Sequence, residues 1–134
     1  MDRPFLDANV LFSASYREET ELLGLWNLPN TTLLASSYSV DEAARNVSSE
    51  QQRRRLNDLL AAVRIVEPPP QSHLPAGVML PEKDVPILLA AISNAATHLL
   101  TGDKRHFGPL FGKVVAGVLI QRPGDYLAAR PPAQ

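Results

Sequence analysis

Four acidic residues stand at the ends of the elements that the sequence predicts. Asp7 and Asp103 each follow a short apolar run, whereas Glu42 and Asp84 open helical stretches. Because the carboxyl ends of parallel strands share one edge of a sheet, these four side chains could converge there. Four bare carboxylates would repel one another, and a hard divalent cation such as Mg²⁺, which takes oxygen ligands, would hold them together. The pattern therefore predicts a metal-dependent phosphodiesterase.

Each of these acids also has a purely structural interpretation. Asp7 could cap the N-terminus of a helix. Ser39 and Glu42 have the spacing of a capping box, which is the stronger interpretation of Glu42 from the residues alone. Asp84 would favour the dipole of the helix that follows it, and Asp103 could close an Asx turn. What favours a metal site is that all four stand where they could share one ion.

Composition excludes several classes of protein. The chain has 134 residues, of which 45% are hydrophobic and 20% charged, so we expect one globular domain over 1–134, with a core over 1–130 and a flexible tail over 131–134. No apolar run approaches the ~20 residues that span a bilayer, and the first residues do not resemble a secretory signal. A cytoplasmic protein with no membrane contact is expected. The absence of cysteine excludes disulfides, thiol nucleophiles and cysteine-ligated zinc.

The net charge of −1 conceals an uneven distribution of charge. The chain has 14 acidic and 13 basic residues, so the basic residues are in excess once the four candidate ligands are set aside. A solvated helix face is the commoner explanation of a run such as Arg53, Arg54 and Arg55. A mildly basic surface around a metal-neutralised pocket would nevertheless suit an anionic partner such as a nucleic acid.

Apolar runs alternate with helical patterns in a βαβα order, which predicts an α/β fold with a parallel sheet. Strands are expected over 4–6, 31–35, 64–66, 98–101 and 114–120. The expected helix N-caps are Thr20, Ser39 and the pair Ser48 and Ser49. The prolines at 68–70 begin the longest expected loop, which runs to Leu80.

Four segments of the chain together resemble the PIN-domain ribonucleases, particularly the toxin nucleases of bacterial toxin–antitoxin pairs. They are residues 5–11 around Asp7, 39–45 around Glu42, 81–91 around Asp84 and 99–107 around Asp103. The order of the acids, with an apolar helix after the third and Thr-x-Asp at the fourth, is the most specific feature, and the similarity covers nearly the whole chain. One departure is residues 104–107, where many relatives carry another acid before the phenylalanine, and this leaves the number of metal ions open.

The resemblance implies a PIN-like three-layer α/β/α sandwich with a central five-stranded parallel sheet. It also implies a metal-dependent endoribonuclease that hydrolyses single-stranded RNA with Mg²⁺ or Mn²⁺, acts as the toxin of a toxin–antitoxin pair and forms a homodimer. An antitoxin peptide could insert an arginine among the carboxylates and cover apolar surface near Leu22, Leu25 and Leu56.

The expected mechanism gives each candidate residue a role. Asp7, Asp84 and Asp103 would bind the metal, and Glu42 would orient the attacking water. Hydrogen-bond donors behind these ligands would be Asn9 and Thr101. The RNA backbone would be held by Lys104, Arg105 or His106, although a plain surface histidine is the commoner role for His106.

Other classes of protein fit the sequence less well. A haloacid-dehalogenase-like phosphatase needs a second Asp at the position of Asn9, and a receiver domain needs a phospho-acceptor Asp where the prolines of 68–70 stand. No Gly-x-Ser-x-Gly elbow supports a serine hydrolase. The remaining alternative is a catalytically silent PIN-like module that only binds RNA or a protein. Metal-dependent RNA cleavage would separate it from the enzyme.

Overall fold

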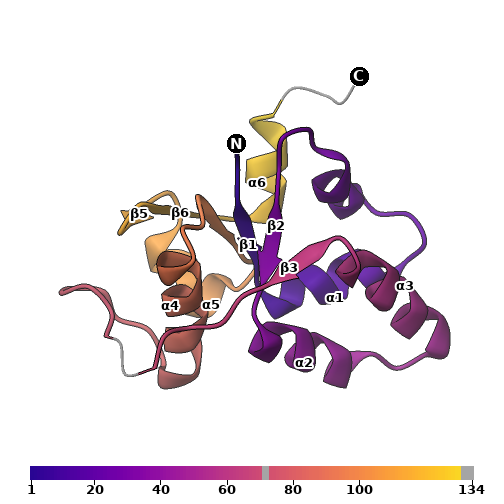
Figure 1. Ribbon diagram of the computed structural model, residues 1–134, viewed down its shortest axis with the longest axis horizontal. Helices are drawn as coiled ribbons and strands as arrows, with labels where there is room; N and C mark the ends of the chain where they lie inside the picture. The colour runs from indigo at the N-terminus through magenta and orange to yellow at the C-terminus, as the bar shows by residue number, and fades with distance from the viewer. Residues whose placement is uncertain (71–72, 131–134) are drawn as a thin grey trace.

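The computed structural model describes residues 1–70 and 73–130, and its centre is a six-stranded sheet (Figure 1). The strands are β1 (Pro4–Leu6), β2 (Leu33–Ala35), β3 (Val63–Ile65), β4 (His98–Leu100), β5 (Val114–Val115) and β6 (Val118–Gln121). Their order is β3-β2-β1-β4-β6-β5, and only the pairing of β5 with β6 is antiparallel within the described ranges. The expected sheet of five parallel strands is therefore confirmed, with a short antiparallel strand added at one edge.

The single strand expected over 114–120 is wrong, because this segment forms a hairpin. Ala116 and Gly117 have φ angles of 48° and 87° and separate β5 from β6. Two successive residues at positive φ match the twist of an antiparallel pair, and glycine takes this conformation without strain. The tail expected over 131–134 lies outside the described residues.

Helices connect the strands. They are α1 (Ala8–Tyr16), the 3₁₀ turn η1 (Glu21–Asn27), α2 (Ser37–Asn46), α3 (Glu50–Leu60), η2 (Glu82–Asp84), α4 (Val85–Ser93), α5 (Lys104–Phe107), η3 (Gly108–Leu110) and α6 (Pro123–Ala128). Thr20 and Ser49 cap η1 and α3 as predicted. The cap predicted at Ser39 is wrong: Ser36 caps α2, and its hydroxyl accepts a hydrogen bond from the Ser39 backbone N–H.

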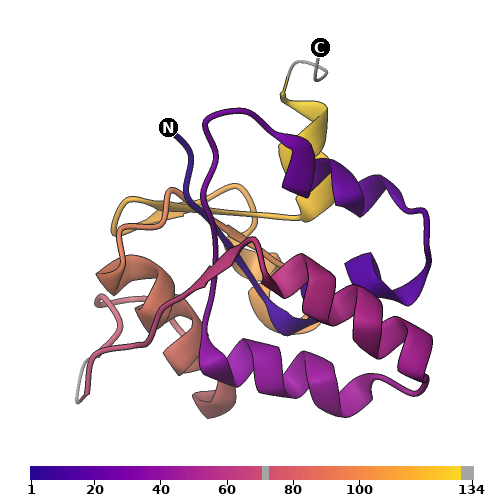
Figure 2. The same ribbon diagram turned by 45° about the vertical axis from the view of Figure 1, so that its right-hand side comes forward.

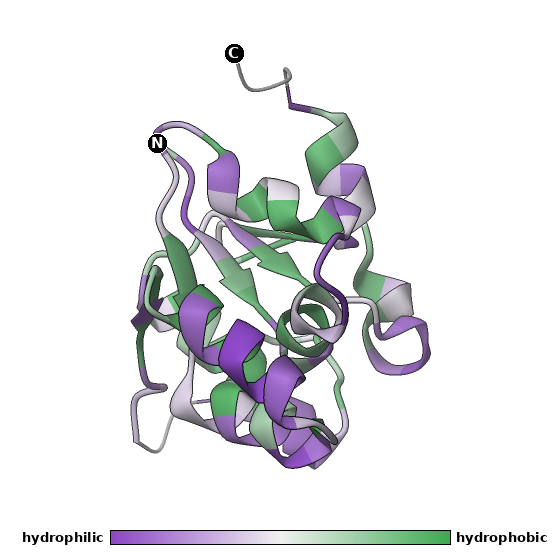
Figure 3. Cartoon of the chain, turned by 90° about the vertical axis from the view of Figure 1, so that its right-hand side faces the viewer, coloured by the Kyte–Doolittle hydropathy of each residue, from purple (hydrophilic) through white to green (hydrophobic). Residues whose placement is uncertain are grey.

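The strands are apolar on both faces because the sheet is covered on both sides. Successive side chains of a strand point to opposite faces, so Phe5 belongs to one core and Leu6 to the other. Helix α4 covers the Phe5 face, whereas α1, α2, α3 and α6 gather on the Leu6 side (Figures 1 and 2). The hydropathy colouring shows green strands between helices whose outer surfaces are largely purple (Figure 3). This arrangement is a three-layer α/β/α sandwich.

Two of the three leucines near which an apolar docking surface is expected are core residues. Leu25 and Leu56 are each 1% exposed and pack in the core on the Leu6 side of the sheet. They cannot form the apolar docking surface that was expected near Leu22, Leu25 and Leu56, because their helical stripes already face the sheet. Within the described ranges, every helix is too short or too polar to cross a membrane.

The strand order determines where the site can form. Strand β1 lies between β2 and β4, and all three run parallel, so their carboxyl ends share one edge. Asp7 follows β1 and Thr101 follows β4, in neighbouring positions at this edge. The chain leaves β1 toward β2 on one side and reaches β4 on the other, which is the type of switch point where open α/β sheets bind ligands.

Candidate metal site and acidic cleft

Asp7 is both a helix cap and a member of the site. Its Oδ1 accepts a hydrogen bond of 2.8 Å from the Ala8 backbone N–H at the start of α1. Its Oδ2 accepts one of 2.8 Å from the Thr101 hydroxyl and one of 3.2 Å from the Asn9 amide. Asp7 as a whole is 4% exposed. The capping interpretation is therefore correct, but it uses only one of the two oxygens.

Burial and neighbouring charges make Asp7 a poor anion in the metal-free protein. Its pKa is raised to about 6, chiefly by desolvation and to a smaller extent by the charges of Glu42 and Asp84. The hydrogen bonds from Thr101 and Ala8 act in the opposite direction, because they stabilise the ionised form. Glu42 and Asp84 can act on the Asp7 pKa because they line the same cleft as Asp7.

Asn9 and Thr101 lie where they were expected, behind Asp7. The Asn9 amide donates to Thr101 Oγ1 over 3.2 Å as well as to Asp7, and its Oδ1 accepts a hydrogen bond of 2.8 Å from the Gly102 backbone. A Cβ at Gly102 would lie 3.4 Å from that Asn9 oxygen, so glycine lets the two segments approach closely. Thr101 Oγ1 in turn accepts from the Asp103 backbone N–H at 3.1 Å. One network thus joins the ends of β1 and β4.

Asp84 does not behave as a helix cap. It stands at the N-cap position of α4, yet its side chain makes no capping hydrogen bond. The residue is 6% exposed, and its Oδ2 accepts no well-directed hydrogen bond among the described residues, although His106 Nδ1 lies 2.8 Å away. Burying an ionised carboxylate without a partner is costly, so a carboxylate in this position favours a cation beside it.

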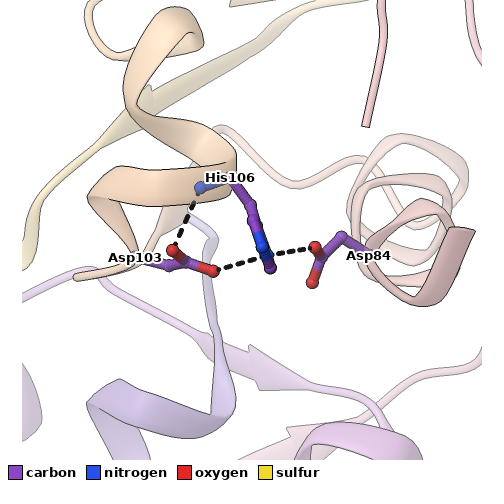
Figure 4. Close-up of side chains that lie close together, drawn as sticks. All are labelled: Asp84, Asp103 and His106. Carbon is purple, nitrogen blue, oxygen red and sulfur yellow. Dashed lines mark hydrogen bonds and ion pairs between the residues drawn. The ribbon is translucent and has the colours of Figure 1, made fainter. Parts of the chain in front are cut away.

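Asp103 and His106 extend the cluster from the opposite side (Figure 4). Asp103 caps α5, because its Oδ1 accepts a hydrogen bond of 3.1 Å from the His106 backbone N–H. His106 Nδ1 lies 2.8 Å from Asp84 Oδ2 and 3.1 Å from Asp103 Oδ2. The side chain of His106 is 22% exposed. The interpretation of His106 as a plain surface histidine is therefore wrong, because α5 turns the ring toward the two acids.

Glu42 faces the same site from α2. Because α2 begins at Ser37, Glu42 lies beyond the first turn, and the capping box with Ser39 does not form. Its half-buried side chain instead lines a cleft of about 340 Å³, which we call the acidic cleft. The residues that line it are Asp7, Ala8, Asn9, Phe12, Glu42, Asn46, Lys83, Asp84, Ile87 and Asp103. All four predicted acids therefore meet in one place.

The cleft also contains residues that the sequence did not indicate. Lys83 precedes Asp84 and supplies a positive charge, and Asn46 stands one turn after Glu42 on α2. Lys83 is next to Asp84 in the sequence, and Asn46 is four residues after Glu42 in a predicted helix. These positions beside predicted site residues could have identified both as candidates. Lys104 and Arg105, expected to hold RNA, are exposed on α5 and do not line the cleft.

The donor set fits a divalent cation. Asp84, Asp103 and His106 each offer one ligand atom, and these atoms lie within 4.8 Å of one another. Asp7 adds a third carboxylate to the same cleft. The buried Asp84 oxygen without a hydrogen bond is the atom that most needs a cation.

Comparison with known proteins gives a structural likeness. No family model matches the chain, and no curated protein matches it in sequence. A crystal structure of VapBC2 from Rickettsia felis, bound to a DNA fragment from their promoter, contains a chain that superposes with a TM-score of 0.62. The match covers 90% of this chain and 98% of that one, at 17% sequence identity. The protein therefore has the PIN-like α/β/α fold that the resemblance in its sequence implies.

Proposed function

We propose that the protein is a metal-dependent endoribonuclease that hydrolyses single-stranded RNA. The observation that carries this proposal is the convergence of Asp7, Glu42, Asp84 and Asp103 from four different elements in one cleft, with one buried Asp84 oxygen lacking a hydrogen bond. Carboxylates of this kind hold Mg²⁺ or Mn²⁺ in enzymes that cleave phosphodiesters. The likeness of fold to a VapBC2 chain supports the same class of protein.

Each residue of the acidic cleft has a separate role in the proposed hydrolysis. Asp7, Asp84 and Asp103 would hold the cation, and the Thr101 and Asn9 hydrogen bonds fix the orientation of Asp7. When bound, a divalent cation lowers the pKa of water and stabilises the phosphoryl oxygens of an in-line displacement. Glu42, which makes no capping contact, is free to orient the attacking water and accept its proton.

Basic residues around the cleft would position the RNA. Lys83 lines the acidic cleft and can approach the phosphate that is cleaved. Lys104 and Arg105 are exposed on α5, directly after Asp103, and would contact neighbouring phosphates. Such contacts set the position of the strand but carry no base preference.

We also propose that the protein is the toxin of a toxin–antitoxin pair, and that it forms a homodimer. The structural neighbour is a complex, VapBC2, which supports a protein partner for this chain as well. Phe12 lines both the acidic cleft and a second groove of about 910 Å³ beside α1, η1 and α6. An antitoxin peptide seated in this groove could reach the carboxylates with an arginine.

RNA cleavage tests the proposal directly. Labelled single-stranded RNA should be cut with Mg²⁺ or Mn²⁺ and left intact in chelator. Asp84→Asn should abolish cleavage, because it removes the charge of the buried ligand, whereas Asp58→Asn on the exposed surface of α3 is the matched control and should keep it. RNA that binds but stays intact with either metal would favour the catalytically silent module.

A further inference from the structure

The position of His106 gives the site a nitrogen donor. His106 Nδ1 lies 2.8 Å from Asp84 Oδ2 and 3.1 Å from Asp103 Oδ2, so the imidazole stands between two carboxylates from different segments (Figure 4). Neither His106 Nδ1 nor Asp84 Oδ2 has a hydrogen-bond partner within the described residues, despite their short separation. The ring and this carboxylate therefore approach each other without an N–H directed between them.

The spacing of these atoms matches the ligands of one ion. Metal–ligand bonds of about 2.1 Å place adjacent ligands of an octahedral ion about 3.0 Å apart. The separations of 2.8 Å and 3.1 Å around His106 Nδ1 agree with that spacing. An ion pair with a protonated imidazole would bring these atoms equally close. The Nδ1–H direction is, however, not aimed at Asp84 Oδ2, as a hydrogen-bonded ion pair would favour.

The backbone holds His106 in this position. Its backbone N–H donates to Asp103 Oδ1 over 3.1 Å, and the next residue, Phe107, is fully buried in the core on the α4 side of the sheet. The short helix α5 is therefore anchored on both sides of the ring. An anchored ring loses little conformational entropy when it binds an ion.

We propose that His106 Nδ1 is a direct metal ligand alongside Asp84 and Asp103, and that this nitrogen makes the site prefer Mn²⁺ to Mg²⁺. The inference rests on the proposed function and adds the choice of metal to it. Mg²⁺ takes oxygen ligands almost exclusively, whereas imidazole suits first-row transition ions. Ligation requires a neutral ring with its proton on Nε2, which leaves the Nδ1 lone pair available to an ion.

The test compares variants that differ in one donor atom. Asn at position 106 places an oxygen close to where Nδ1 stands, so His106→Asn exchanges nitrogen for oxygen at the same point. His73→Asn makes the same change at an exposed histidine that is not part of the cluster of Asp84, Asp103 and His106. Calorimetric titrations with Mn²⁺ and with Mg²⁺ would be run on each protein, and electron spin-echo spectroscopy of bound Mn²⁺ would detect a directly bonded ¹⁴N.

The expected result is ¹⁴N modulation in the wild type and in His73→Asn, and its loss in His106→Asn. Mn²⁺ affinity should fall about tenfold or more in His106→Asn, while Mg²⁺ affinity changes little. Mn²⁺ binding without ¹⁴N modulation in the wild type would overturn this inference and leave the proposed function standing. Tighter binding of both ions by His106→Asn would also overturn it, since the ring would then only obstruct the site. Failure of the wild type to bind either ion would overturn both proposals.

Discussion

Thr101 Oγ1 donates a hydrogen bond of 2.8 Å to Asp7 Oδ2, and this contact joins the carboxyl ends of β1 and β4. The two residues are 94 positions apart in the sequence. The hydroxyl is fully buried and also accepts a hydrogen bond from the Asp103 backbone. Asp7 is therefore oriented by the protein itself, and the segment carrying Asp103 is tied to the same atom.

Thr101→Val should show how much the site depends on this hydroxyl. Valine has nearly the same shape, so its main effect is to remove one donated and two accepted hydrogen bonds from a buried network. We expect a loss of about 1–3 kcal/mol in the free energy of unfolding. The pKa of Asp7 should rise further, because the Thr101 hydrogen bond lowers it. Carboxyl-carbon NMR of Asp7 in chelator would measure the pKa.

Thr101→Ser is the control, because it keeps the hydroxyl and should give the wild-type Asp7 pKa. An unchanged Asp7 pKa in the valine variant would show that the Thr101 hydrogen bond is unimportant for Asp7.

The buried carboxyl of Asp7 should make the metal-free protein less stable as pH rises. Its pKa is raised to about 6 in the folded state, above its value in the unfolded chain, so the stabilisation is fully present below the unfolded pKa and is lost as pH rises through about 6. Asp7→Asn cannot ionise and should lack this dependence. Relative to wild type it should gain about 2 kcal/mol between pH 4 and pH 7.

Urea unfolding in chelator at several pH values would measure that difference, with Asp58→Asn as a control for the same chemical change on the surface. The exchange of Asp7 for an amide also alters its contacts with Ala8 and Asn9, and this adds an offset that does not vary with pH. A difference between Asp7→Asn and wild type that stays flat from pH 4 to pH 7 would contradict a raised Asp7 pKa.

A second hydrogen-bond network joins Asp2, near the N-terminus, to Tyr126 of α6, away from the acidic cleft. The Tyr126 hydroxyl donates to Asp2 Oδ2 over 2.6 Å, and Arg130 contacts the same oxygen at 2.9 Å. The Tyr126 hydrogen bond is the largest influence lowering the pKa of Asp2. Tyr126→Phe should therefore destabilise the protein at pH 7 by about 1–3 kcal/mol.

The pH dependence of the Tyr126→Phe effect tests whether the hydrogen bond to Asp2 is its cause. Because the pKa of Asp2 is lower in the folded protein than in the unfolded chain, Asp2 stabilises the protein at pH values above its pKa in the unfolded chain. This stabilisation is lost as pH falls through the pKa of Asp2 in the folded protein. The difference in unfolding free energy between wild type and Tyr126→Phe should therefore shrink in acid. Tyr16→Phe, at a tyrosine that is 55% exposed, is the control and should change little. Equal effects of the two substitutions at pH 7 would show that the Asp2 contact is not stabilising.

A protein partner should compete with metal at the acidic cleft. If an antitoxin places an arginine against the carboxylates, its inhibition of RNA cleavage should weaken as the Mg²⁺ concentration rises. Co-purification from the native host, followed by measurement of particle mass, would show both the partner and the expected homodimer. A monomer without a bound protein would contradict the proposed assembly.

Much of the fold and of the acidic cluster follows from local patterns. Strands such as Pro4–Leu6 are apolar on both faces, which predicts a buried parallel sheet, and strand ends then locate Asp7 and Asp103. The sequence could not decide between Ser36 and Ser39 as the cap of α2, because both precede residues compatible with a helix. That ambiguity made a capping box at Glu42 look plausible.

The features that the sequence missed depend on contacts between distant segments. His106 meets Asp84 only because α5 packs its Phe107 into the core beside α4, and no local pattern encodes that approach. Asp84 has the position of a cap, and only the folded chain shows that its side chain makes no capping bond. The hairpin at Ala116 and Gly117 had a local signal in the glycine, but the apolar residues around it outweighed that signal.

The chemistry of the cleaved RNA ends tests the central claim most directly. In a single turnover in H₂¹⁸O with Mg²⁺ or Mn²⁺, hydrolysis by a metal-activated water should give a linear phosphate that carries one solvent oxygen. Chelator and Asp84→Asn should each prevent it, and Asp58→Asn should not. The contrary result is a 2′,3′-cyclic phosphate formed equally well in chelator. That product would mean that the RNA 2′-hydroxyl is the nucleophile and that acid–base groups such as His106 and Lys83, not a metal held by the carboxylates, perform the reaction.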